Sequence, residues 1–220
     1  MGWSIAVLLG QQIVQISKYP RIFVFENFLN DRECQFLIDL AYGRLEPSSV
    51  HVNNNATIDA SSSMRQSHSF TIPTTQIYKY DILDRIQLKL RASFTQLRAT
   101  SEPLQVQLYQ ENQAYGLHYD TNPSVQREMT VVIYLNTVVL GGETIFPQQS
   151  FSNVLLNTDL GVTRRVCRDH VSPSTLKIRP KRGRAVIFYP SDPRTLHGSC
   201  PVVFGYKYVA QQWFMPHRRM

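Results

Sequence analysis

The pattern that decides the fold begins after Pro103, with the stretch Leu104-Gln-Val-Gln-Leu-Tyr109 and, after a turn, Tyr115-Gly-Leu-His118-Tyr-Asp120. Both read as short β-strands. Further strand-like runs rich in β-branched and aromatic residues follow at Thr130–Leu135, Thr144–Phe146, Thr175–Ile178, Ala185–Tyr189 and Tyr206–Phe214. Glycine and proline turn signals separate these runs. The C-terminal half is therefore expected to consist of many short strands.

Helices are expected ahead of these strands. After a strand-like run at Arg21–Phe28, Asn30 is a plausible N-cap and Glu33 follows three residues later, which is a capping-box pattern. We therefore predict a helix over about 30–43 and a second one over about 77–96. The apolar positions of the second helix are Ile82, Ile86, Leu88, Leu90 and Phe94.

Helices first and many short strands afterwards indicate an α+β fold. We expect a double-stranded β-helix, or jelly roll, over about residues 103–215, with the two helices supporting one of its sheets. The domain is expected to cover 21–216 and to follow an N-terminal extension, 1–20. Segment 45–63 is polar and is expected to be a loop, and 147–174 is expected to be a long connection.

The composition is that of a globular protein. The chain has 220 residues, of which 43% are apolar, and a formal net charge of +7. This charge permits acidic or nucleic-acid partners, but the basic clusters are short and are typical of a solvated surface. The apolar run Trp3–Gly10 is too short to span a bilayer and lacks the basic start of a signal peptide. We therefore predict no membrane span and leave the compartment open.

The segment around His118 and Asp120 is the first candidate for chemistry. Two residues apart on a strand, their side chains lie on the same face. His197, in Thr195-Leu-His-Gly-Ser, is the candidate for a third ligand. Two histidines and one carboxylate form the facial triad of non-haem iron(II) oxygenases, which leaves positions open for a bidentate 2-oxo acid and for dioxygen. The alternative is that His118 and Asp120 are two polar residues on an exposed strand face.

Lys207 follows His197 by ten residues, with a turn at Phe204-Gly205 between them. On an otherwise apolar strand this ammonium needs an anionic partner, because a buried unpaired charge is costly. The distal carboxylate of 2-oxoglutarate would be such a partner. The alternative is a lysine that snorkels from a strand edge. The remaining histidines lack ligand-like spacing and are expected not to bind metal: His51, His68, His170 and His217.

Three cysteines are present: Cys34, Cys167 and Cys200. None forms a CxxC pair, which argues against a zinc site. At most one internal disulfide can form, and Cys167 with Cys200 is the better pair because both lie in the C-terminal half near the proposed site. A cytosolic chain would keep all three reduced.

Taken in order, these stretches resemble the catalytic domain of collagen-type prolyl 4-hydroxylases, and the small single-domain members from plants, algae, bacteria and large viruses are most similar in length. The resemblance runs from about residue 20 to residue 215. Besides the two stretches quoted first, it rests on Arg127-Glu-Met-Thr-Val-Val-Ile-Tyr134, Gly141-Gly-Glu-Thr-Ile-Phe-Pro147, Lys181-Arg-Gly-Arg-Ala-Val-Ile-Phe-Tyr189, Leu196-His197-Gly-Ser-Cys-Pro201 and Lys207 with Trp213.

The resemblance implies a role for each matching position. It implies iron(II) bound by His118, Asp120 and His197, 2-oxoglutarate bound by Lys207, Tyr109 and Tyr134, and substrate contacts by Arg127 and Trp213. The implied reaction is hydroxylation of peptidyl proline by dioxygen with release of succinate and CO2, as in procollagen-proline 4-dioxygenases, and L-ascorbate would keep the iron reduced. The implied partner is a proline-rich peptide in polyproline II conformation.

Other functions stay open at this point. The same chemistry could act on nucleic acid, which the net charge permits, although nucleobase dealkylases typically hold the co-substrate with arginine where this chain has Lys207. Lysine or a small molecule could also be the substrate, or the chain could be a jelly-roll binding module without catalysis. Gln211 stands where many members of the family have threonine, and Arg65-Gln-Ser-His-Ser replaces the family's Arg-Thr-Ser before a glycine. Eukaryotic relatives work in the secretory lumen; the oligomeric state is not determined by the sequence.

Overall fold

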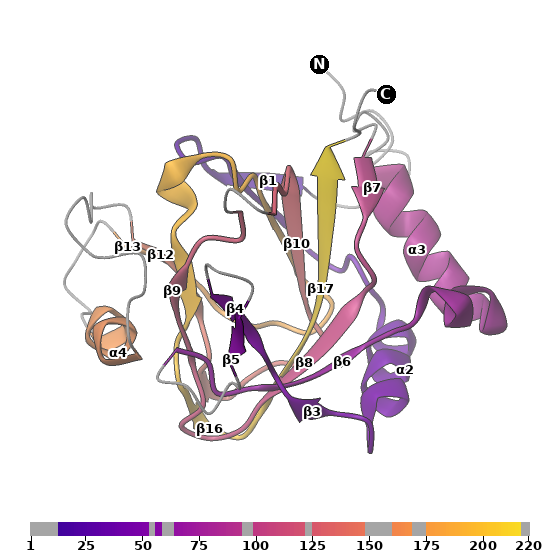
Figure 1. Cartoon of the computed structure of the whole chain (residues 1–220), viewed down its shortest axis with the longest axis horizontal. Helices are drawn as coiled ribbons and strands as arrows, with labels where there is room; N and C mark the ends of the chain where they lie inside the picture. The colour runs from indigo at the N-terminus through magenta and orange to yellow at the C-terminus, as the bar shows by residue number, and fades with distance from the viewer. Residues whose placement is uncertain are drawn as a thin grey trace.

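The computed structural model describes residues 13–52, 56–58, 64–93, 99–121, 125–147, 160–168 and 175–216. Within these residues the chain forms two main antiparallel sheets and few helices (Figure 1). The large sheet has the order β1 (Ile13–Ser17), β2 (Ile22–Phe25), β14 (Ala185–Phe188), β10 (Met129–Tyr134), β17 (Lys207–Pro216), β8 (Gln105–Tyr109), β6 (His68–Thr71) and β3 (Glu46–Pro47), and β7 (Ala99–Ser101) also pairs with β17. The small sheet has the order β13 (Thr175–Ile178), β12 (Thr144–Pro147), β15 (His197–Ser199) and β9 (Tyr115–His118).

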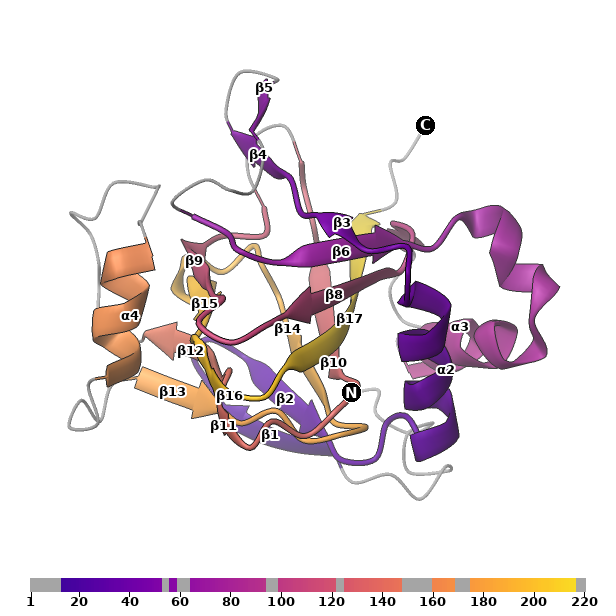
Figure 2. The same ribbon diagram turned by 90° about the horizontal axis from the view of Figure 1, so that it is seen from below.

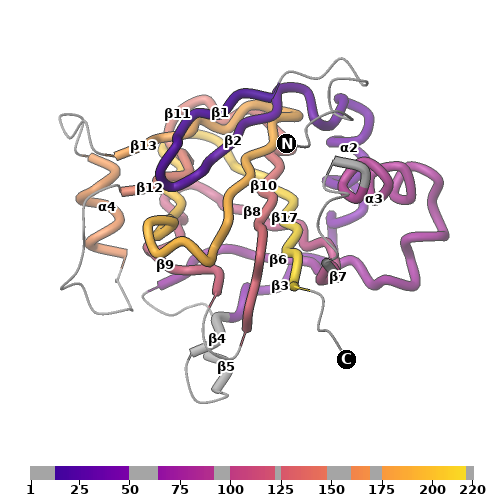
Figure 3. Tube along the Cα trace, turned by 90° about the horizontal axis from the view of Figure 1, so that it is seen from above, coloured from indigo at the N-terminus to yellow at the C-terminus, as the bar shows by residue number. Residues whose placement is uncertain are grey.

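Two short ribbons complete the strands, β4 (Val50–Val52) with β5 (Ala56–Ile58) and β11 (Leu140–Gly141) with β16 (Val202–Phe204). The helices are α2 (Asp31–Ala41), α3 (Asp81–Ser93) and α4 (Leu160–Arg168), and the 3-10 turns are η1 (Thr74–Lys79) and η2 (Pro193–Thr195). Helices α2 and α3 lie at one end of the molecule and α4 at the other, with the strands between them (Figures 2 and 3). None of the described helices is long and apolar enough to cross a bilayer.

The capping box predicted for the first helix is confirmed. The Asn30 side chain accepts from the Glu33 amide, and the Glu33 carboxylate accepts from the Asn30 amide, both at 2.9 Å. The second helix begins later than predicted, at Asp81, because residues Thr74–Lys79 form a 3-10 turn. Its expected end near residue 96 lies outside the described residues.

Three segments differ from the sequence-based expectation. The connection 147–174 contains the helix α4, which pattern alone did not indicate because it opens with Leu-Gly-Val-Thr and carries three arginines. Segment 45–63 holds the short strands β3, β4 and β5 where a loop was expected. β1 lies in the segment expected to be an extension and pairs with β2 at the edge of the large sheet.

Strand β10 explains how the core is divided. All six of its side chains are buried, and alternate ones face opposite ways. Val131 and Ile133 belong to the apolar cluster that the helices cover, together with Leu37 of α2. Val132 and Tyr134 belong to a second cluster between the two sheets. The space between the sheets is where the candidate active-site residues lie.

Candidate active site

The three predicted metal ligands converge at one point between the sheets. His118 is the last residue of β9 and His197 the first of β15, and the two are paired directly across these strands. Asp120 lies beyond the end of β9, so the alternation of strand side chains, which predicted its orientation, does not apply to it. The Thr130 hydroxyl on β10 donates to Asp120 Oδ2 at 2.7 Å and holds the carboxylate instead.

The ligand atoms are arranged for one metal ion. They all lie within 4.8 Å of one another, and among the described residues this is the one such cluster. Asp120 Oδ1 is 3.6 Å from His118 Nε2, and Asp120 Oδ2 is 3.7 Å from His197 Nε2. Each imidazole places Nδ1 against a backbone carbonyl, Gly116 at 2.8 Å and Thr195 at 2.9 Å. Both Nε2 atoms are thereby left to bind a metal.

Electrostatics keep Asp120 and His197 in the protonation states that a metal requires. Burial alone would raise the pKa of Asp120, but His197, His118 and Arg127 together hold it well below its ordinary value. Burial, together with the charge of His118, lowers the pKa of His197 to about 4. A carboxylate and a neutral imidazole are the forms that coordinate metal. Two imidazoles and one carboxylate fit the donor set of a non-haem iron(II) site.

A cavity lies next to the ligands and contains Lys207. Its volume is about 30 Å³, and it is lined by Gln107, Tyr109, Tyr115, His118, Val132, Thr144, His197, Gly198, Ser199, Lys207, Val209 and Gln211. The turn at Gly205 (φ +93°) returns the chain so that Lys207 opens β17, as predicted. The Lys207 ammonium donates to Ser199 Oγ at 2.9 Å, and no carboxylate among the described residues forms an ion pair with it.

Lys207 is 2% exposed, and burial lowers its pKa to about 7, against a small opposing effect of the Glu143 charge. Tyr109 and Tyr134 place their rings 5.4 and 5.5 Å from the Lys207 ammonium. A buried ammonium without a carboxylate partner fits a dicarboxylate co-substrate, whose distal carboxylate would pair with it.

The two predicted co-substrate tyrosines have different surroundings. Tyr109 lines the cavity, and its hydroxyl donates to Gln107 Oε1 at 3.1 Å. Tyr134 is fully buried and is not among the lining residues; its hydroxyl donates to Thr144 Oγ1 at 2.8 Å. Thr144 itself lines the cavity, so Tyr134 orients a cavity hydroxyl from behind.

Arg127 and Trp213, the two predicted substrate residues, lie together. The Arg127 guanidinium is 4.1 Å from the Trp213 ring and binds Glu102 with two hydrogen bonds of 2.6 and 2.8 Å. Arg127 Nη1 also donates to the Asp120 carbonyl at 3.1 Å. This group of three side chains is therefore fixed directly beside the carboxylate ligand.

Sequence reasoning missed Tyr115 and Arg65. The Tyr115 ring stacks on the His118 ring with centroids 3.8 Å apart. The Arg65 guanidinium lies 4.7 Å from the centroid of the same Tyr115 ring. Arg65 is buried, and its Nη2 has no hydrogen-bond partner in the described part of the chain. Burial raises the pKa of Tyr115 to about 12, so its hydroxyl stays protonated. The short sequence distance from Tyr115 to His118 was an available signal, whereas Arg65 is far from all three ligands in the sequence and gave none.

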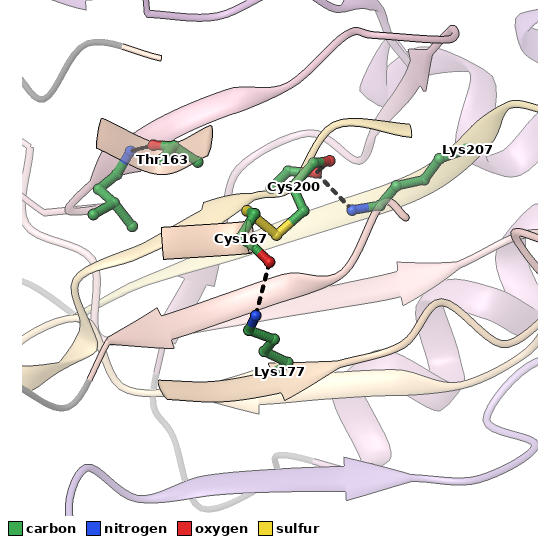
Figure 4. Close-up of a disulfide and its surroundings, with 7 residues drawn as sticks. Thr163, Cys167, Lys177, Cys200 and Lys207 are labelled. Carbon is green, nitrogen blue, oxygen red and sulfur yellow. Dashed lines mark hydrogen bonds between the residues drawn. A yellow bond between two sulfur atoms is a disulfide. The ribbon is translucent and has the colours of Figure 1, made fainter. Parts of the chain in front are cut away.

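Helix α4 is attached to both histidine strands (Figure 4). The Leu117 amide, next to His118 on β9, donates to Thr163 Oγ1 at 2.9 Å. The disulfide Cys167–Cys200 joins the helix to the segment that follows β15, which confirms the cysteine pair favoured by the sequence. The Lys177 ammonium of β13 donates to the Cys167 carbonyl at 2.8 Å.

Comparison with known proteins agrees with this geometry. Residues 104–215 match the model of the 2OG-Fe(II) oxygenase superfamily. Prolyl 4-hydroxylase 2 of Arabidopsis thaliana is 33% identical over 94% of this chain and 71% of that protein, and prolyl 4-hydroxylase 13 of the same plant is 30% identical over 90% and 72%. A solved viral collagen prolyl hydroxylase from Paramecium Bursaria Chlorella virus-1, in complex with 2OG, is 27% identical and covers 93% of this chain and 99% of its own, with a TM-score of 0.62.

The matched segment contains all three candidate ligands as well as Lys207, and the curated relatives extend the match over most of the chain. The chain therefore belongs to the 2OG-Fe(II) oxygenase superfamily and, within it, to the prolyl 4-hydroxylase family.

Proposed function

We propose that this chain hydroxylates peptidyl proline in an iron(II)- and 2-oxoglutarate-dependent reaction that releases succinate and CO2. The observation that carries the proposal is the convergence of His118, Asp120 and His197 beside a cavity that holds the Lys207 ammonium, which pairs with no carboxylate of the described residues. The relatives named above, prolyl hydroxylases of a plant and of a virus, supply the substrate class.

Each side chain has a defined part in this reaction. His118, Asp120 and His197 hold iron(II), and the hydrogen bonds behind them fix their orientation. Lys207 pairs with the distal carboxylate of the co-substrate, and Tyr109 borders the same space. When bound, iron(II) with 2-oxoglutarate and dioxygen supplies the oxidant that converts a C–H bond of the substrate to C–OH.

Arg127 and Trp213 are proposed to contact the peptide. A proline-rich peptide is extended, loses little entropy on binding, and suits an aromatic surface. The Arg127 guanidinium lies 4.1 Å from the Trp213 ring and donates to the Asp120 carbonyl, so this pair lies beside the metal ligands. L-Ascorbate is expected to restore iron that becomes oxidised without substrate turnover.

We propose the jelly roll as the architecture of the domain. Eight strands are divided equally between the two sheets, and the chain passes from one sheet to the other at every step except from β12 to β13. β8, β10, β14 and β17 are neighbours in the large sheet, and β9, β12, β13 and β15 make up the small one. This supports a double-sheet jelly roll with the α2–α3 layer outside it. The Cys167–Cys200 disulfide supports an oxidising compartment, such as the secretory lumen.

The test is reconstitution with iron(II) under anaerobic conditions, followed by dioxygen, 2-oxoglutarate and a panel of proline-rich peptides. Succinate and peptide mass are read together. Succinate coupled to one added oxygen on proline, and lost in His118→Ala, supports the proposal. Succinate without peptide modification would move the substrate to another class. Bound iron with no succinate in any mixture would favour a binding module.

A further inference from the structure

Two buried glutamine side chains that are hydrogen-bonded to each other line the cavity, one from β8 and one from β17. Gln107 and Gln211 are 2% and 7% exposed, and both line the cavity beside the metal ligands. Gln107 Nε2 donates to Gln211 Oε1 at 2.7 Å. Neither residue has a role in the reaction described so far.

The donors and acceptors in this glutamine network are defined. The Tyr109 hydroxyl donates to Gln107 Oε1 at 3.1 Å, and Gln107 Nε2 donates to Gln105 Oε1 at 2.9 Å as well as to Gln211 Oε1. A primary amide has two N–H donors and one carbonyl. Both donors of Gln107 are therefore used, its carbonyl is occupied, and its amide plane is fixed.

The last group of this glutamine network is the Gln211 amide nitrogen. Its oxygen is turned to Gln107, and Gln211 Nε2 has no acceptor among the residues that the structure describes. Because Gln211 lines the cavity, this donor is presented to whatever occupies that space. Donors that belong to a polarised hydrogen-bond network bond more strongly.

Strand register places this donor between the two ends of the co-substrate site. Gln211 pairs with Val132 on β10, one same-face position from Thr130, which holds Asp120. On its own strand, Gln211 is two same-face positions from Lys207. A five-carbon dicarboxylate that extended from Lys207 toward the metal ligands would bring its oxo-acid end near Gln211.

We propose that Gln211 is a co-substrate-binding residue that donates an N–H to the oxo-acid end of 2-oxoglutarate, and that Gln107 is the positioning residue that aims it. The inference rests on the proposed function. It adds a second polar contact to 2-oxoglutarate, at the end of the molecule opposite to the one that Lys207 binds. A hydrogen bond to a charged acceptor is among the stronger ones, so its loss should weaken binding by about tenfold to a hundredfold.

The test compares two ligands on Mn(II)-loaded protein by calorimetry. 2-Oxoglutarate has the oxo-acid end and succinate lacks it, whereas both have a carboxylate for Lys207. Gln211→Leu should lose about tenfold or more in affinity for 2-oxoglutarate and little for succinate. Gln107→Leu should lose less of the preference for 2-oxoglutarate over succinate, because the Gln211 amide is then no longer held by Gln107 but is still present.

Gln211→Glu separates this role from a structural one. The glutamate is isosteric and keeps an oxygen for Gln107, but it replaces the donor by a negative charge. If the proposal holds, Gln211→Glu loses more 2-oxoglutarate affinity than Gln211→Leu. If Gln211 has only a packing role, Gln211→Leu loses more affinity, and it also loses more thermal stability. If wild-type protein binds 2-oxoglutarate and all three variants bind it with the same affinity as wild type, this inference alone is overturned. Wild-type protein that does not bind 2-oxoglutarate overturns the proposed function and this inference with it.

Discussion

Burial of Lys207 should make co-substrate binding depend on pH. In the free protein its pKa is about 7, because burial of the ammonium lowers it more than the Glu143 charge raises it. The distal carboxylate of 2-oxoglutarate stabilises the charged form, so binding raises this pKa. Below pH 7 the lysine is already charged and affinity is flat. Above pH 7 each bound co-substrate must bring a proton with it.

The magnitude follows from the size of the pKa shift. With a bound pKa above 9, affinity falls about tenfold for each pH unit above 7, which is about 1.4 kcal/mol per unit. At pH 8 only about 9% of the free protein has Lys207 charged, and binding takes up about 0.9 proton. The carboxylates of the ligand do not titrate in this range, and metal-bound histidines are held neutral.

Calorimetry of 2-oxoglutarate with Mn(II)-saturated protein checks this at pH 6.5 to 8.5, in phosphate and in Tris. The different ionisation enthalpies of these buffers report the number of protons taken up. Lys207→Arg is the matched control, since arginine stays charged and its complex should lose the pH dependence whatever its affinity. A flat wild-type affinity with no difference between the buffers would refute the reasoning, because Lys207 would then be charged before binding.

Three further predictions concern the supports of the site. Thr130→Val removes the donor to Asp120 and should weaken metal binding about tenfold to a hundredfold by equilibrium dialysis, while Thr130→Ser should restore it. Replacing Cys167 and Cys200 by serine opens a loop with a sequence separation of 33 and should lower stability by about 3 to 4 kcal/mol in urea unfolding; an unchanged midpoint would contradict this. Cys34 is fully buried, and burial raises its pKa to about 11, so a thiol reagent should react with it only after unfolding; rapid labelling of the folded protein would exclude this environment.

Much of the site was predictable because its chemistry is encoded in residue type and spacing. His118 is recognisable by its spacing from Asp120, His197 by its place in a short segment that ends at a glycine, and Lys207 by the Phe204-Gly205 turn. The metal cluster and the buried ammonium were therefore expected before any coordinates. The capping box at Asn30 was recognisable for the same reason, since it depends on residues three apart.

What could not be predicted depends on contacts between distant segments. Thr130 is ten residues from Asp120, and only the fold brings its hydroxyl to the carboxylate. The bond between Gln107 and Gln211 spans 104 residues and follows from the pairing of β8 with β17. Helix α4 has a weak local signal and depends on the disulfide and on Thr163 for its place. Local periodicity holds no information about such partners.

Lys207 should also limit the stability of the protein in the absence of co-substrate. Its pKa is about 7 when folded and 10.5 when unfolded. Between these values the unfolded chain binds one proton more, so this residue's contribution to stability is least favourable below pH 7 and improves as pH rises to 10.5. The shift corresponds to about 4 to 5 kcal/mol at neutral pH and below, before relaxation of the surroundings.

Lys207→Met keeps the length of the side chain and removes the charge, so it should unfold at higher urea than wild type at pH 7, by about 2 to 4 kcal/mol. The advantage should shrink toward pH 9, because the wild-type lysine is then neutral when folded. In the presence of Mn(II), which both proteins should bind, adding 2-oxoglutarate should stabilise wild type but hardly the variant, since a ligand stabilises only the protein that binds it. A variant less stable than wild type without co-substrate would mean that Ser199 and the two tyrosine rings already offset the burial of this charge.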